Sequence, residues 1–114
     1  MARNVGVVFA EMLEAIAGIE NAAAGKTLAD FEREWLLKHG IQRGIEIIPE
    51  AARHIPAELR DRGPEIPWKQ VIAVGSVLRH DYHRIANPIV WAVVTEDLPA
   101  LKAAVEALQA GLGE

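Results

Sequence analysis

Four side chains near one end of a predicted helix have types suited to acid–base and phosphate chemistry: Ser76, Arg79, His80 and Tyr82. An imidazole titrates near neutrality, so His80 can act as a general base or a general acid. Arg79 could hold a phosphate and stabilise the negative charge that develops on it. Neighbouring side chains on a helix project about 100° apart, so Arg79 and His80 of one chain need not converge on one phosphate, and a dimer could pair the arginine of one chain with the histidine of the other. The alternatives are a structural histidine at a helix end and an ordinary surface or interface arginine.

Two flanking residues could support this pair. Ser76 precedes His80 by one helical turn, so the two side chains share a face, and Ser76 could orient the imidazole or a phosphate. A serine at such a position also often bonds its own helix backbone. Tyr82 follows His80 by two residues. Its ring is either exposed, with an accessible hydroxyl, or half-buried with one hydrogen-bond partner.

The run from Arg79 to Arg84 contains two arginines and two histidines against one acid, so it is locally basic. The chain as a whole carries a formal charge of −4, and any contact with a polyanion must therefore come from a local patch. Duplicated in a dimer, the run could form a basic floor, or it could be an ordinary solvated helix end. The residues that could line such a floor are His83 and Arg84, joined from an earlier helix by Arg43, Arg53 and His54.

Arg43, Glu46 and Glu50 have helical spacing that places Arg43 with Glu46, and Glu46 with Glu50, on a common face. The acids could orient an arginine or assist His80, but a buried Arg–Glu pair that holds the fold together is the favoured interpretation. The chain has no cysteine, His39 and His54 are isolated, and no His/carboxylate set has metal-ligand spacing. Phosphate-loop and dinucleotide motifs are absent as well, so we expect no metal and no cofactor.

Length and composition predict one all-α domain over residues 1–114. The chain is 51% hydrophobic, yet no uncharged apolar run approaches the roughly 20 residues needed to cross a bilayer. No secretory signal is evident, so we expect a cytoplasmic protein that does not enter the membrane. Alanine, leucine and glutamate are abundant, and alternating β-type runs are missing.

The expected architecture is an up-and-down bundle of four main helices with short helices at the corners. The first helix should run from about Asn4 to Ala24. The second should start at a Thr27 cap and continue to about His54, bending near Pro49. A short helix over 56–62 and a helix from Pro67 should follow. Cap-plus-proline starts are expected at Asn87 and Asp97, the latter opening a last helix that ends at Gly111.

Apolar residues at helical spacing predict which faces are buried. The second helix should bury a stripe that includes Phe31, Trp35 and Ile41, and the segment after Asn87 should bury Ile89, Trp91 and Val94. Trp35, Trp68 and Trp91 all lie on such stripes. We expect them to be core or dimer-interface anchors rather than base-stacking platforms.

Two segments together resemble the HepT-like branch of the HEPN superfamily. The first is Arg43-Gly-Ile-Glu-Ile-Ile-Pro-Glu-Ala, which is similar to the family's Arg-x-Ile-Glu-Ile-Ile-Gly-Glu-Ala helix. The second is Pro64-Glu-Ile-Pro-Trp68, followed by His80-Asp-Tyr82, Trp91 and Asp97-Leu-Pro99. No single piece is diagnostic, but the ordered set is specific and extends from Phe31 to Leu101.

The resemblance implies a homodimer with a shared cleft that cleaves RNA without a metal. It also implies a minimal nucleotidyltransferase as antitoxin partner, and Tyr82 matches the tyrosine that such a partner can adenylylate. Many members have Arg-Asn where this chain has Gly75 and Ser76, whereas another branch reads Gly-Asn-x-Leu-Arg-His-x-Tyr, which matches here except at Ser76. An active ribonuclease toxin is the leading interpretation. The alternatives are a degenerate module that binds a nucleotidyltransferase or nucleotide, and a plain interaction bundle without a ligand.

Overall fold

The computed structural model describes residues 4–60 and 86–111 of the chain. The described part contains helices, turns and loops and no strand, which confirms the all-α prediction. The elements in chain order are α1 (Val5–Ala23), α2 (Leu28–Arg33), α3 (Trp35–Ala52), α4 (Ala57–Arg60), α6 (Asn87–Ala92), the π-helical segment η1 (Val93–Asp97) and α7 (Leu98–Gly111). The predicted helix from Pro67, with Trp68, lies outside the described residues.

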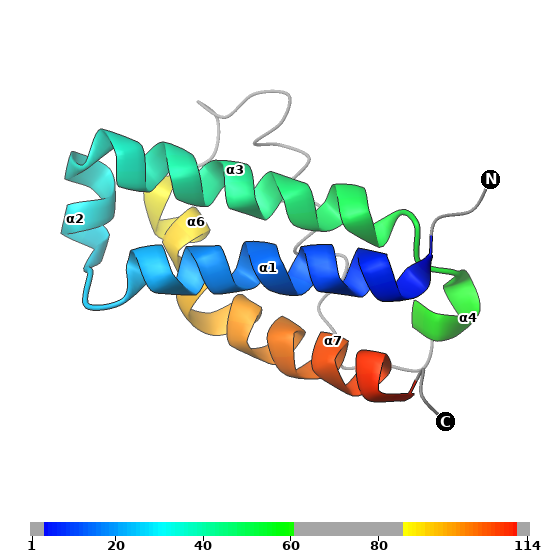
Figure 1. Ribbon diagram of the computed structural model, residues 1–114. Helices are drawn as coiled ribbons and strands as arrows, with labels where there is room; N and C mark the ends of the chain where they lie inside the picture. Colours follow the sequence, from blue (N-terminus) through cyan, green and yellow to red (C-terminus); the bar gives the residue numbers. More distant parts are fainter. Residues whose placement is uncertain (1–3, 61–85, 112–114) are drawn as a thin grey trace.

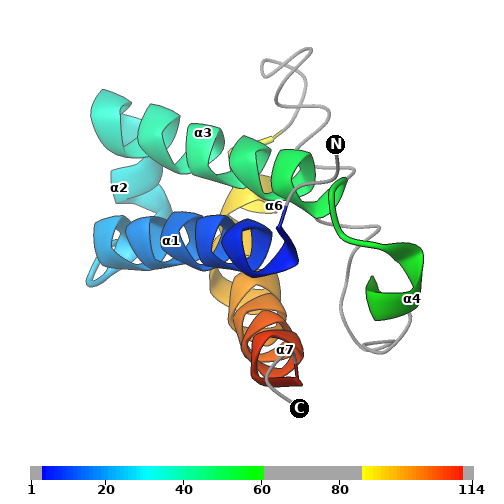
Figure 2. The ribbon, with the colours of Figure 1, turned by 45° about the vertical axis from the view of Figure 1, so that its right-hand side comes forward.

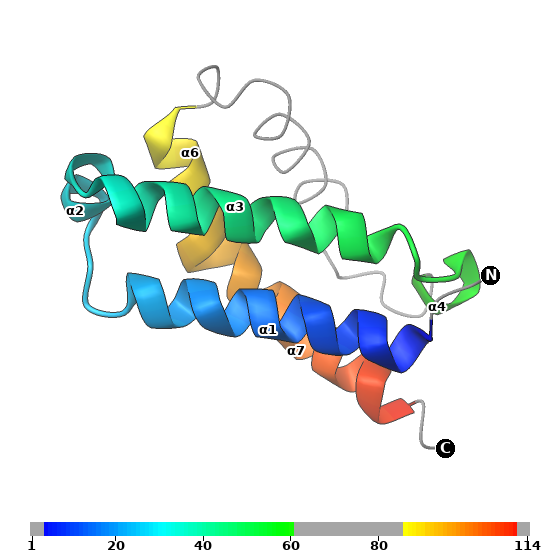
Figure 3. The same cartoon turned by 45° about the horizontal axis from the view of Figure 1, so that its top comes forward.

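Three long helical segments lie side by side. Helices α1 and α3 run antiparallel along the length of the molecule, joined at one end by α2 (Figures 1 and 3). The continuous segment α6–η1–α7 starts near α2 and runs back along the other side of α1, as the view closer to the axis of α7 makes clear (Figure 2). The beginning of α1 and the ends of α3 and α7 therefore lie at the same end of the molecule.

Helix α1 begins and ends where local chemistry predicts. The Asn4 side-chain oxygen accepts hydrogen bonds from the Gly6 and Val7 amides, satisfying donors that the first helical turn leaves unpaired. The chain leaves the helix at Gly25, whose φ of 73° lies in the left-handed region that glycine enters without steric cost. The predicted apolar stripe is buried along the whole helix: Val8, Phe9, Met12, Ile16 and Ile19.

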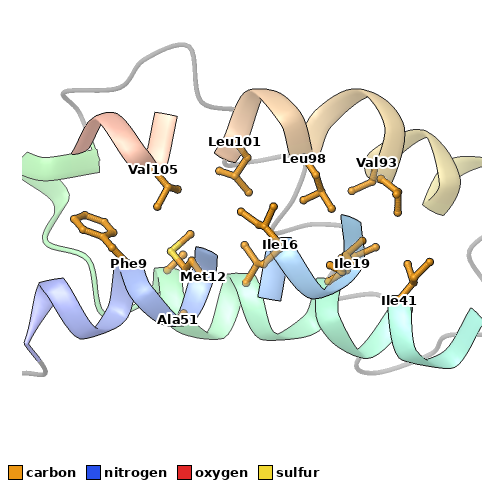
Figure 4. Close-up of a cluster of buried hydrophobic side chains, with 14 of the residues drawn as sticks. Phe9, Met12, Ile16, Ile19, Ile41, Ala51, Val93, Leu98, Leu101 and Val105 are labelled. Atoms are coloured by element: carbon orange, nitrogen blue, oxygen red, sulfur yellow. The ribbon is translucent and has the colours of Figure 1, made fainter. Parts of the chain in front are cut away.

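The core lies where the three long segments meet (Figure 4). Phe9 of α1 lies beside Val105 of α7, and Ile16 lies beside Leu98 and Leu101. Helix α3 contributes a third wall of fully or almost fully buried side chains: Ile41, Ile45, Ile48, Ala51 and Ala52. Burying one such aliphatic side chain contributes about 1.5–3 kcal/mol. The core is therefore sufficient to fix α3 in place and to set which of its faces points outward.

The single helix predicted from Thr27 to His54 is wrong, because Glu34 divides it into α2 and α3. Glu34 has extended backbone angles of φ −90° and ψ 106°. The predicted cap at Thr27 is confirmed as a complete capping box, in which Thr27 Oγ1 accepts from the Asp30 amide and Asp30 Oδ2 accepts from the Thr27 amide. The break resets the helical phase after Phe31, so the stripe predicted to continue from Phe31 to Trp35 is interrupted.

Helix α3 continues through Pro49 and ends at Ala52. Pro49 is buried within the last turn and cannot donate to the carbonyl one turn before it. Helix α4 confirms that a short helix follows Pro56, and Ile55 beside it is buried.

The predicted helix starts at Asn87 and Asp97 need correction. Asn87 is the first residue of α6, whose N-cap is Ala86, and its side-chain amide donates instead to Glu32 of α2 at 3.4 Å. Asp97 caps nothing, because the helix runs on through it in a π-helical register. Its partial burial raises the pKa of the Asp97 carboxyl, and the neighbouring carboxylate of Glu96 adds to the rise.

Pro99 gives a physical reason for the π-helical segment. A proline has no N–H to donate one turn back, and its ring crowds the carbonyl there, which here belongs to Thr95. The helix widens at this point, and the Leu98 amide bonds to the Val93 carbonyl. Val94 is buried as predicted, together with Val90 and Val93, whereas Ile89 is 53% exposed, against prediction.

Candidate functional site

The predicted site residues divide into two groups. Arg43 and Glu46 lie on α3, within the described part of the chain. The remaining predicted residues lie outside the described residues: Ser76, Arg79, His80, Tyr82, His83 and Arg84. The described side of the site is therefore the outward face of α3, together with the part of α1 beside it.

Arg43 and Glu46 form the ion pair that their spacing predicts. The distance from Arg43 Nη1 to Glu46 Oε1 is 3.9 Å, and the side chains are 61% and 18% exposed. The expectation of a buried pair is wrong, because the buried face of α3 is occupied by Ile41, Ile45 and Ile48 and turns Arg43 toward solvent. Exposed pairs of this kind contribute about 0–1 kcal/mol, which leaves the guanidinium available to an anionic ligand at little cost.

A surface depression follows the seam between α1 and α3. At its centre it is apolar, with small residues on both helices and Ile47 as a shared wall: Ala15, Gly18 and Ala22 of α1, with Gly40 and Gly44 of α3. Arg43 lies on its rim. Beyond Ile47 the depression becomes polar and is lined by Glu11, Glu50, Arg53 and His54. Of the three cations predicted to share a basic surface, Arg43 therefore borders the apolar depression, and Arg53 and His54 border the polar one together with two acids.

Trp35 is the least expected feature of this face. The apolar stripe predicted that Trp35 would be an anchor in the core or in a dimer interface. Trp35 is 67% exposed, so it does not lie in the core. The rings of Trp35 and His39 stack with centroids 4.3 Å apart and an angle of 26° between their planes. His39 Nδ1 lies 2.9 Å from the Trp35 carbonyl oxygen. Because a carbonyl can only accept, this ring nitrogen carries the proton, and His39 is not isolated.

Acids surround the base of Trp35, and most have a cationic partner. The carboxylate of Glu34 lies 3.2 Å from Lys26 Nζ and 3.7 Å from an Arg33 nitrogen. Asp30 pairs with Arg33 at 2.6 Å, and the Thr27 amide is the main cause of the lowered pKa of the Asp30 carboxyl. Local charge at this corner is therefore close to balanced.

The described residues hold no group of three or more His, Cys, Asp or Glu side chains arranged to bind a metal ion. Over the same residues, every helix is too short or too polar to cross a membrane. The chemistry available on the described face is thus an exposed aromatic pair, a guanidinium and a mixed set of carboxylates and imidazoles.

Comparison with known protein families shows to which family the chain that carries this face belongs. Residues 12–108 match the family described as "Ribonuclease HepT-like". The chain belongs to the HepT-like ribonuclease family. The match includes α3 with Arg43 and Glu46, and it also includes the segment that carries Arg79, His80 and Tyr82.

The chain is similar over most of its length to individual relatives, of which two are matched over nearly their whole length. The chain is 32% identical over 99 residues to "Probable ribonuclease HepT" of Thermococcus cleftensis, covering 87% of this chain and 90% of that protein. It is 29% identical over 104 residues to "Putative RNase MJ1380" of Methanocaldococcus jannaschii, covering 91% and 95%. The same organism has "Gamma-glutamylcyclotransferase and putative RNase MJ0434", 34% identical over 102 residues, which are 90% of this chain and 46% of that protein. No solved structure matches significantly.

Two residues of the HepT-like α3 face escaped the sequence analysis, namely Trp35 as an exposed ring and His39 as its stacking partner. Their spacing of four residues, with Arg43 four further on, was visible in the sequence. This spacing did not indicate an exposed face, because Trp35 also continues the apolar stripe that begins at Phe31. Only the break at Glu34 separates the two helical phases.

Proposed function

We propose that this protein is a metal-independent endoribonuclease toxin that acts in the cytoplasm as a homodimer and is paired with a minimal nucleotidyltransferase antitoxin. Membership of the HepT-like ribonuclease family over residues 12–108 is the observation that carries the proposal. His80 and Arg79 are the proposed catalytic residues, with Ser76 and Glu46 in support and Arg43, His83 and Arg84 on the RNA. Tyr82 is the proposed acceptor if the partner adenylylates the toxin.

The proposed reaction needs no redox partner and no external nucleophile. A base removes the proton of an RNA 2′-hydroxyl, the 2′-oxygen attacks the adjacent phosphorus, and the bond from phosphorus to the 5′-oxygen breaks. An acid protonates the departing oxygen, so a 5′-hydroxyl and a 2′,3′-cyclic phosphate result. His80 can take either proton-transfer role, and two copies of His80 in a dimer can take one each. Arg79 stabilises the charge on the phosphorane oxygens.

Expression of the protein without its partner, with His80→Ala as the matched variant, tests this function. The wild type should arrest growth and cleave RNA in the presence of a chelator, whereas His80→Ala should do neither while keeping the same helical circular dichroism. Arg79→Ala should lower the rate by about 2–4 kcal/mol of transition-state stabilisation, as loss of an oxyanion donor does. A purified dimer that leaves RNA intact would end the proposal.

A second function is favoured by one residue of the sequence. Gly75 stands where many family members have an arginine, which is consistent with a module that binds a nucleotidyltransferase or a nucleotide but no longer cleaves RNA. Gly75→Arg separates the two. If Arg79 already binds the phosphate in an active enzyme, Gly75→Arg should leave the ribonuclease activity unchanged or lower it. If the chain is a degenerate enzyme that lacks the family's arginine, Gly75→Arg should raise that activity.

A homodimer is part of the proposal because pairing of Arg79 from one chain with His80 from the other requires it. The apolar centre of the seam between α1 and α3 is consistent with a further protein surface, since small domains seldom leave such surface uncovered. Light scattering at micromolar concentration should give twice the 12.4 kDa mass of the chain. A monomer would exclude catalysis across two chains.

A further inference from the structure

Three side chains form a ladder on the outward face of α3. Trp35, His39 and Arg43 are each separated by four residues, so they lie above one another at successive turns. The ladder is about 12 Å long at the helical rise of about 1.5 Å per residue. A stacked single strand rises about 3.4 Å per nucleotide, so the ladder matches about three nucleotides.

The first two members are held as a flat, exposed surface. The ring stack at 4.3 Å and the contact of His39 Nδ1 with the Trp35 carbonyl fix both rings on the helix, while Trp35 remains 67% exposed. A fixed, exposed aromatic ring loses little conformational entropy when a second ring stacks on it. Every nucleobase has a π-face, so such a surface accepts bases with little regard to sequence.

The third member supplies the positive charge that a nucleic acid backbone needs. Arg43 is 61% exposed, and its ion pair with Glu46 is long at 3.9 Å. At the other end of the ladder, Glu34 is balanced by Lys26 and Arg33. Lys26 and Arg33 therefore offset the charges of Glu34 and Asp30, whereas Glu32 is bonded to the neutral Asn87 amide and keeps its charge.

We propose that the ladder of Trp35, His39 and Arg43 binds single-stranded RNA, with a base stacked on Trp35 and the backbone phosphate two turns further along held by Arg43. This inference rests on the proposed function, because cleavage of RNA is what makes an RNA strand the ligand. It adds a binding subsite on α3 that positions the strand and takes no part in the chemical step.

The test measures RNA binding separately from cleavage. The probe is a fluorescein-labelled oligoadenylate with 2′-O-methyl groups, which cannot be cleaved through a 2′-hydroxyl, and binding is followed by fluorescence anisotropy. Trp35→Ala should raise the Kd about tenfold, within the range measured for loss of one base–aromatic stack. Trp35→Phe should recover most of the affinity. Leu36→Ala is the matched control, because Leu36 is the next residue, is 79% exposed, and offers no aromatic ring.

The outcomes separate the subsite from the enzyme. A wild type that binds and cleaves RNA, with Trp35→Ala equal to wild type in binding, overturns the subsite and leaves the proposed function standing. Binding that depends on Trp35, in a protein that cleaves nothing, supports the subsite and overturns the proposed function. A wild type that does not bind the probe overturns the subsite. So does a Trp35→Ala variant that loses its oligomeric state together with RNA affinity, because that result assigns Trp35 to a protein contact.

Discussion

Gly40 and Gly44 lie one turn apart on α3 and meet different surroundings. A Cβ at Gly44 would lie 2.7 Å from Ile19 Cγ1 and 2.8 Å from Ile19 Cδ1, whereas one at Gly40 would have no atom within 4 Å. Gly44 is therefore a position at which α1 and α3 pack closely. Its lack of a side chain is required there, in contrast to Gly40.

Alanine at each of these two positions gives a matched pair of stability variants. Gly40→Ala should raise the free energy of unfolding by about 0.5–1 kcal/mol, since it removes a helix-interior glycine and fills open space. Gly44→Ala gains the same helix propensity but overpacks a core contact, which costs about 1–3 kcal/mol. Urea unfolding should therefore place Gly44→Ala below Gly40→Ala by that amount. Equal stability would mean that Ile19 moves aside freely.

At the residue scale, spacing predicted partners better than it predicted exposure. The Arg43–Glu46 pair followed from a separation of three residues on a helix. Its exposure could not be predicted, because that depends on which face the core of Ile41, Ile45 and Ile48 occupies. The exposure of Trp35 could not be predicted for a related reason, because a large apolar residue fits equally well in a core stripe and on a binding surface.

At the element scale, the capping box of Thr27 and Asp30 stabilises the start of α2. Thr27→Ala removes the acceptor for the Asp30 amide and should cost about 1 kcal/mol. Thr95→Ala is the control, because its hydroxyl donates to the Trp91 carbonyl within a helix and satisfies no orphan donor of a helix end. Chemical unfolding of the two variants should show a loss for Thr27→Ala alone. Equal losses would show that the cap adds nothing beyond a general hydroxyl effect.

The same capping box predicts that the stability of the protein depends on pH in the acidic range. The pKa of Asp30 is below its ordinary value of 3.8, first because of the Thr27 amide and then because of the Thr27 hydroxyl and nearby cations. A carboxyl with a depressed folded pKa stabilises the protein above its unfolded pKa, and this stability is lost as the pH falls from about 3.8 through the folded pKa. Asp30→Asn should therefore flatten the loss of stability in this acidic range. An unchanged pH profile would contradict the role of the Asp30 carboxylate.

Capping chemistry predicted one helix start correctly, at Thr27, and failed at Asn87 and Asp97. The Thr27 cap is confirmed, and α1 from Val5 to Ala23 agrees closely with the predicted range of about Asn4 to Ala24. The break at Glu34 occurs without glycine or proline, at an ordinary helix-forming residue. The sequence predicted that Asp97 would cap a new helix with Pro99 in its first turn. A widened π-helical turn instead lets the helix continue through Asp97 and Pro99.

At the scale of the whole molecule, charge limits how RNA can bind. The chain has a formal charge of −4, so an RNA strand is repelled at long range and must be held by short-range contacts. Lys102 pairs with Glu20 at 3.0 Å between α7 and α1, so this cation is already engaged within the protein. The proposed ladder fits this limit, because stacking on Trp35 is independent of net charge and Arg43 adds a local cation.

The salt dependence of RNA binding distinguishes these two contributions. For a single strand, each phosphate neutralised by a cationic side chain adds about −0.7 to the slope of log K against log salt. Arg43→Ala should therefore reduce the steepness of that slope by about 0.7, whereas Arg43→Lys should keep the slope because the charge remains. Trp35→Ala should lower affinity equally at every salt concentration and leave the slope unchanged, since stacking releases no counterions. Anisotropy titrations of the uncleavable oligoadenylate across a salt series measure all three variants. If Arg43→Ala keeps the wild-type slope, Arg43 does not contact a phosphate, and the backbone must be held by another part of the chain.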